Sequence, residues 1–222
     1  MRGMGLRQAR FTRQPSWRVA ATRHPPVAIF DRVTSEAEFD AAWELEAAFN
    51  PRADAGHLLL ALPRSQWVFG PGSGHVLAPF AYRTPSRFSD GSFGVYYAAL
   101  DETTAIQEVA FHRERFLATT HEPACVLEEQ VLWAEVTGEL TDIRGEQGTH
   151  PEWYGPATAH YPAAQALGSS LWRAGQTGLV FSSVRNPGGE CFGIFRPRAI
   201  SSCLPLRPLR YAWDGTRIAS WA

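Results

Sequence analysis

A short hairpin in the last quarter of the chain constrains the fold more than any other feature of the sequence. Gly178 to Val184 reads as a buried strand, mostly apolar, and Cys191 to Phe195 reads as the strand that returns. The segment between them, Asn186-Pro187-Gly188-Gly189, has the composition of a tight turn. Two apolar strands joined by so short a connection pair antiparallel. The sequence therefore predicts a buried antiparallel element.

Other segments add strands and helices around this hairpin. Further strands are expected at residues 57–62, 94–100, 125–136, 140–143, 209–213 and 216–220. Helices are expected from Ser35 to Phe49, from Asp101 as N-cap through Phe116, and from Ala163 to Ala174, with a loop at residues 70–74. Because strands outnumber helices and hairpins recur, we predict a single α+β domain. Its core would be a mixed, largely antiparallel sheet flanked by helices.

Composition excludes several classes of protein. The chain has 222 residues, of which 45% are hydrophobic, and a formal net charge of -1, so it lacks the global basic field that dominates nucleic-acid binding. No apolar stretch approaches the roughly 20 residues that span a bilayer. Three scattered cysteines indicate a reducing compartment rather than a disulfide framework. We therefore expect a cytoplasmic protein with no direct nucleic-acid or membrane partner.

Residues 1–26 are rich in arginine and contain no acidic residue. Such a segment repels itself and offers little apolar surface to bury. We predict a flexible N-terminal arm, followed by one domain over residues 27–222.

Two blocks of sequence carry a specific resemblance. The first runs from Pro85 to His112 and contains Arg87-Phe88, the strand Gly94 to Tyr97, Thr104-Ala105 and Glu108. The second runs from Gly178 to Pro197 and contains the tripeptide Ser183 to Arg185 and the turn Gly188 to Cys191. Together with the upstream segments Phe49 to Arg52 and Leu62 to Gly72, these motifs resemble the RES family, named for an Arg, a Glu and a Ser. Ser86-Arg87-Phe88-Ser89 departs from the Gly-Arg-Trp-Asn of many members.

The resemblance implies a fold similar to that of ADP-ribosyltransferases and a toxin that cleaves the nicotinamide–ribose bond of NAD+. Glu108 would stabilise positive charge on the ribose. Arg64 and Arg87 would clamp the two phosphates, with Arg64 preferred to Arg83 as the first family arginine. Tyr97 would face the ribose and nicotinamide. Ser183 would bind the nicotinamide amide or a phosphate.

The resemblance also implies a partner, an antitoxin with a helix-turn-helix DNA-binding domain. The acceptor stays open between phosphate, water and a protein, the last being a mono-ADP-ribosyltransferase with a host protein target. A non-catalytic domain that binds a partner is the remaining alternative, and both a monomer and a homodimer stay open.

Other kinds of site are not supported by the sequence. Gly70, Gly72 and Gly74 lack the strand-to-helix setting of a dinucleotide fingerprint. The histidines and cysteines show no paired spacing for a metal, so no metal cofactor is expected. Ser183 lies outside the Gly-x-Ser-x-Gly turn of a serine hydrolase.

Overall fold

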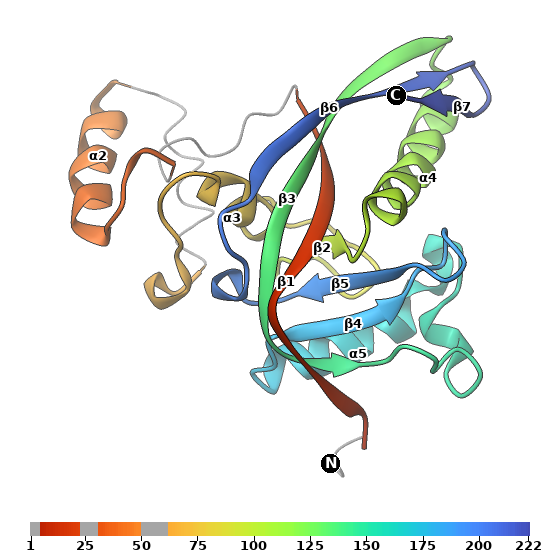
Figure 1. Ribbon diagram of the computed structural model, residues 1–222, viewed down its shortest axis with the longest axis horizontal. Helices are drawn as coiled ribbons and strands as arrows, with labels where there is room; N and C mark the ends of the chain where they lie inside the picture. Colours follow the sequence, from red (N-terminus) through yellow and green to blue (C-terminus); the bar gives the residue numbers. More distant parts are fainter. Residues whose placement is uncertain (1–4, 23–30, 50–61) are drawn as a thin grey trace.

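The computed structural model describes residues 5–22, 31–49 and 62–222 (Figure 1). The strand predicted at residues 57–62 and the motif from Phe49 to Arg52 lie outside these ranges, apart from their end residues Leu62 and Phe49. In the described ranges, no helix is long and apolar enough to cross a membrane.

One mixed sheet organises the described residues. Its strands are β1 (Arg7–Ala21), β2 (Tyr96–Ala99), β3 (Cys125–Asp142), β4 (Gly178–Ser182), β5 (Glu190–Ile194), β6 (Leu204–Trp213) and β7 (Ile218–Trp221). The order is β1-β2-β5-β4-β3-β6-β7, and β1 also pairs with β3. The pairing of β3 with β4 is parallel and the others are antiparallel. The prediction of a single α+β domain with a mixed, largely antiparallel sheet is confirmed.

The hairpin predicted from the sequence is the pair β4 and β5. Its register places Phe181 opposite Cys191 and Ser182 opposite Glu190. All residues of β5 after Glu190 are buried, as are the first four residues of β4. The hairpin therefore lies in the middle of the sheet, where continuous apolar runs can be buried on both faces.

The N-terminal segment corrects the prediction of a flexible arm over residues 1–26. Residues 7–21 form β1, which pairs antiparallel with β3 from Arg7 opposite Asp142 to Ala21 opposite Glu129. Arg7, Arg10 and Arg13 are exposed, whereas Ser16 and Val19 are buried. Backbone pairing with a distant strand orders the segment, and Phe11, Trp17 and Val19 pack against the core on the two faces of the sheet.

Helices α2 (Glu36–Phe49), α3 (Ser73–Ala81), α4 (Glu102–Thr120) and α5 (Tyr161–Arg173) complete the described fold. Asp101 caps α4 as predicted, since its Oδ1 accepts a hydrogen bond of 2.8 Å from the backbone N–H of Thr104. Helix α3 replaces the second half of the predicted loop at residues 70–74. Gly70 and Gly72 do form a turn there, with φ of 91° and 81°.

The core lies on both faces of the sheet. One cluster contains Ala110 and Leu117 of α4 and Leu167 of α5, and a second contains Val76 and Phe80 of α3. Tyr96 belongs to the second cluster, while Tyr97 packs against the first. Successive residues of a strand point to opposite faces, so Tyr97 faces the side of the sheet that α4 and α5 cover.

Candidate active site

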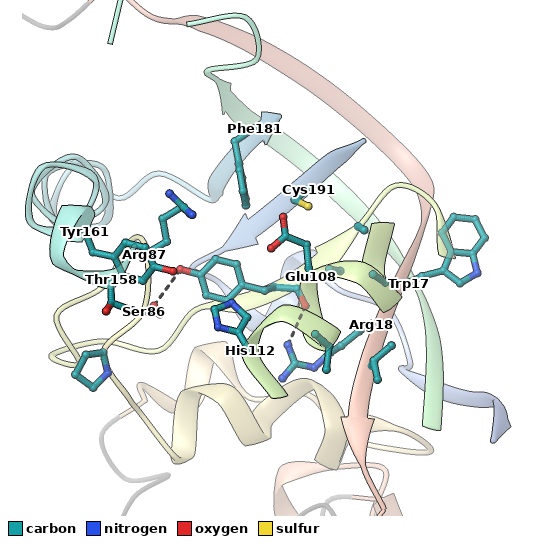
Figure 2. A pocket seen from close by; sticks show the side chains of 17 residues that line it. Trp17, Arg18, Ser86, Arg87, Glu108, His112, Thr158, Tyr161, Phe181 and Cys191 are labelled. Atoms are coloured by element: carbon teal, nitrogen blue, oxygen red, sulfur yellow. Dashed lines mark hydrogen bonds between the residues drawn. The ribbon is translucent and has the colours of Figure 1, made fainter. Parts of the chain in front are cut away.

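A cavity of about 350 Å³ opens on the face of the sheet that α4 covers (Figure 2). Strands β1, β2, β4 and β5, the loop before β2, helix α4 and the start of α5 all line it. The lining side chains that can bind a ligand or take part in a reaction are those of Arg18, Ser86, Arg87, Tyr97, Glu108, His112, Tyr161 and Cys191. The cavity is therefore assembled from segments spread over most of the chain.

Glu108 and Ser183 form the central contact of this site. The hydroxyl of Ser183 donates a hydrogen bond of 2.6 Å to Oε1 of Glu108. Oγ of Ser183 in turn accepts hydrogen bonds from the backbone N–H groups of Arg185 (3.1 Å) and Asn186 (2.9 Å). A serine hydroxyl has one hydrogen and two lone pairs. Both lone pairs are engaged by backbone donors, so the hydrogen of Ser183 is directed to Oε1 of Glu108. Oε2 of Glu108 makes no hydrogen bond to the described residues.

Tyr97 holds the loop that carries Arg87. Its hydroxyl accepts a hydrogen bond of 3.0 Å from the backbone N–H of Phe88 and lies 3.0 Å from Oγ of Ser86. Burial raises the pKa of Tyr97 to about 12, partly offset by the hydrogen bond with Ser86. The phenol is therefore neutral near pH 7 and keeps a proton that it can donate.

Arg87 is a cation held inside the protein. Only 8% of the residue is exposed. Its Nη1 donates to the backbone carbonyl oxygens of Trp153 (3.2 Å) and Gly155 (3.0 Å), and its guanidinium lies 4.8 Å from the centre of the Tyr161 ring. These contacts use one nitrogen and one face of a group that has five N–H donors. The remaining donors keep the capacity to bind an anion in the cavity.

Arg18 is a second cation of the cavity, and sequence reasoning missed it. Its Nη1 donates a hydrogen bond of 2.8 Å to the carbonyl oxygen of Tyr97, and its guanidinium lies 5.0 Å from the centre of the Tyr96 ring. Figure 2 shows the guanidinium groups of Arg18 and Arg87 well apart, with the Glu108 carboxylate to one side of them, beside Cys191. The signal available in the sequence was the β-prone run Trp17-Arg18-Val19, which indicates a strand.

Arg64 is not brought to the cavity, which corrects its assignment as the first arginine of the site. It lies outside the cavity lining, and its exposed guanidinium forms ion pairs with Glu36 (2.9 Å) and Asp40 (2.8 Å). The alternative, Arg83, donates instead to the carbonyl oxygens of Phe80 and Ser92. Arg87, Tyr97 and Glu108 do line the cavity, and Ser183 stands behind Glu108.

His112 lies at the mouth of the cavity, one helical turn after Glu108. The residue is exposed overall, but protein atoms around the ring displace water and lower the pKa of His112, an effect that the nearby Glu108 carboxylate opposes. Cys191 lines the floor, and burial raises the pKa of its thiol well above the usual range. Over the described residues, no group of three His, Cys, Asp or Glu side chains is placed to hold a metal ion.

The fold and this site define an α+β domain in which two arginines and a hydrogen-bonded carboxylate line one cavity. The sequence profile of the RES domain matches residues 58–214, and the chain belongs to the RES domain family. A relative from Sinorhizobium fredii (strain NBRC 101917 / NGR234), the uncharacterized protein y4oC, is 30% identical over 212 residues, which is 91% of this chain and 84% of the relative.

A solved structure also resembles the chain. It comes from the crystal structure of the M. tuberculosis MbcT-MbcA toxin-antitoxin complex. The match has a TM-score of 0.48 and 12% identity, and it covers 90% of this chain and 87% of that one.

Proposed function

We propose that this protein is the toxin of a toxin–antitoxin system and that it binds NAD+ and cleaves its nicotinamide–ribose bond. Membership of the RES family supports the class. The observation that carries the chemistry is that Glu108, Arg18 and Arg87 line one cavity, with Oε1 of Glu108 held by a hydrogen bond of 2.6 Å from Ser183.

The positive charges of the site suit the two phosphates of NAD+. NAD+ carries two phosphate charges, and guanidinium groups bind phosphates through paired, charge-assisted hydrogen bonds. Arg18 and Arg87 both line the cavity, and both retain N–H groups beyond those that donate to backbone carbonyl oxygens. They are therefore the proposed phosphate ligands, and Arg18 takes the place that the sequence assigned to Arg64.

The carboxylate suits the bond that breaks. When the bond between ribose C1′ and the nicotinamide nitrogen breaks, its electron pair leaves with nicotinamide, which becomes neutral, and positive charge develops on the ribose. Glu108 can stabilise that charge or orient the ribose hydroxyls through Oε2. The neutral phenol of Tyr97 supplies an aromatic face and one proton for a polar group of the substrate. The acceptor that attacks C1′ is phosphate, water or a nucleophile of a host protein.

Product analysis tests this proposal. The purified chain is incubated with NAD+, with and without inorganic phosphate, and the products are identified by mass spectrometry. We expect nicotinamide together with ADP-ribose, ADP-ribose 1-phosphate or a modified protein, and each product identifies a different acceptor. A Glu108→Gln variant keeps the size of the side chain and should lose activity, whereas Arg64→Ala, outside the cavity, should not. Failure of the wild-type chain to release nicotinamide under either condition would falsify the proposal.

The biological role is tested separately. Expression of the chain in bacteria should stop growth and deplete cytoplasmic NAD+, and co-expression of a cognate antitoxin with a helix-turn-helix domain should restore both. Toxicity that is equal for wild type and Glu108→Gln, with NAD+ undiminished, would favour a non-catalytic domain that binds a partner.

A further inference from the structure

Two polar residues behind the cavity tie the turn that carries Ser183 to the helix that carries Glu108. Asn186 lies in the turn between β4 and β5, and Thr104 lies in the first turn of α4. The side-chain amide of Asn186 donates a hydrogen bond of 2.7 Å to Oγ1 of Thr104. Neither residue lines the cavity, so any effect on the reaction has to pass through other residues.

Thr104 has a single arrangement available to its hydroxyl. Its Oγ1 donates a hydrogen bond of 2.6 Å to Oδ2 of Asp101, the N-cap of α4, and its backbone N–H donates to Oδ1 of the same carboxylate at 2.8 Å. Asp101 as an ionised carboxylate can only accept, so the hydroxyl of Thr104 presents a lone pair to Asn186. The nitrogen of the Asn186 amide, rather than its oxygen, must then face Thr104. Thr104 is fully buried, which makes loss of a partner here costly.

The turn packs against the helix at Gly189, where there is no room for a side chain. A Cβ on Gly189 would lie 2.3 Å from Oγ1 of Thr104 and 3.0 Å from Nδ2 of Asn186. Within the turn, the backbone N–H of Asn186 donates to Oγ of Ser183 (2.9 Å), and the N–H of Gly189 donates to the carbonyl oxygen of Asn186 (2.9 Å). Asn186 is therefore bonded to Thr104 by its side chain and to Ser183 by its backbone.

We propose that Asn186 and Thr104 are positioning residues that set the direction of the Ser183 hydroxyl and, through it, the orientation of the Glu108 carboxylate. Helix α4 and the β4–β5 turn are joined twice, once by Asn186 and Thr104 and once by Ser183 and Glu108. The first contact fixes the distance between turn and helix, and the second then has one geometry in which Oε1 is engaged and Oε2 is directed to substrate. This inference rests on the proposed function.

The test compares variants that change the hydrogen bond while keeping the shape of the side chain. Asn186→Asp is isosteric but turns an acceptor toward the lone pair of Thr104 and adds a charge near Asp101. Asn186→Ala removes the donor, and Thr104→Val removes the hydroxyl. Thr104→Ser keeps the hydroxyl and serves as the conservative rescue. Thr103→Val is the matched control, because Thr103 lies in the same helical turn with an exposed side chain.

The readout is steady-state nicotinamide release from NAD+ by the full chain, with kcat and KM measured separately and with the thermal midpoint recorded for each variant. Misplacing a reacting group by about 1 Å costs on the order of 100-fold in rate. We expect kcat to fall roughly 10- to 100-fold for Asn186→Asp and Thr104→Val, and less for Asn186→Ala. KM should change little, since the phosphate ligands are untouched. Thr104→Ser and Thr103→Val should stay near wild type.

The outcomes separate this inference from the function on which it rests. A wild-type chain that releases no nicotinamide overturns both. An active wild type whose Asn186→Asp and Asn186→Ala variants, folded by their thermal midpoints, keep wild-type kcat overturns the positioning role alone. The positioning role is also overturned if the variants lose stability and raise KM while kcat is unchanged. Should Thr104→Val fail to fold, the two Asn186 variants, which lie in a partly exposed turn, decide the question.

Discussion

The hydroxyl of Ser183 makes three hydrogen bonds in the described structure, and its removal has a calculable cost. Ser183→Ala deletes a donor to the Glu108 carboxylate and an acceptor for the backbone N–H groups of Arg185 and Asn186. A hydrogen bond to a charged group contributes about 1.5–3 kcal/mol and a neutral one about 1 kcal/mol. Because Ser183 is only half-buried, water can replace part of the hydrogen bonding that Ser183→Ala removes. We expect the free energy of unfolding to fall by about 3 kcal/mol, which lowers the thermal midpoint by roughly 6–12 °C in a domain of this size.

Urea and thermal unfolding of paired variants measure this effect. The neighbouring residue supplies the control, since the hydroxyl of Ser182 makes no hydrogen bond to the described residues and Ser182 is also half-buried. Ser182→Ala should leave the free energy of unfolding within about 0.5 kcal/mol of wild type. A double-mutant cycle of Ser183→Ala with Glu108→Ala should give a coupling of about 1–2 kcal/mol. Equal stability of Ser183→Ala and Ser182→Ala would refute the hydrogen-bond network as described.

Three further predictions concern the rest of the site. Arg18→Ala should raise KM for NAD+ about 10-fold or more through loss of charge-assisted contacts, whereas Arg64→Ala should change it less than about 2-fold; steady-state kinetics would contradict this if the two variants behaved alike. Gly168→Ala places a Cβ 2.0 Å from the carbonyl oxygen of Phe88 and should lower stability by about 1–3 kcal/mol, which an unchanged urea midpoint would disprove. Burial raises the pKa of Tyr97 from 10.0 to about 12, so its contribution to stability is complete below pH 10 and is lost as the pH rises toward 12. The loss of stability across that range should be smaller in Tyr97→Phe than in wild type, and equal slopes would contradict the assignment.

The parts of the fold that were predictable from sequence depend on neighbours along the chain. The hairpin of β4 and β5, the N-cap Asp101 and the opposite directions of Tyr96 and Tyr97 all follow from turn composition, capping chemistry and strand alternation. Each is confirmed because the determining groups lie within a few residues of one another.

The predictions that failed depended on partners far away. Strand β1 looked like a flexible arm because its order comes from pairing with β3, which places Arg7 opposite Asp142. Arg64 looked like a site residue by its place in a motif, but the fold directs it to Glu36 and Asp40. Arg18 was missed because it lies in β1. A residue in a segment that is predicted to be flexible is given no defined position.

By itself, the sequence determined the fold class and the family, because motif composition and local periodicity carry that information, and it predicted Glu108 and Ser183 as site residues. Only the tertiary structure decided which arginines share a cavity with Glu108, and that Ser183 directs its one hydrogen to a carboxylate 75 residues away. A side chain's partner across the sheet is set by the register of distant strands and by the packing of α4 against them. No local pattern in the chain encodes that register, so the geometry of the site emerges only when the sheet is assembled.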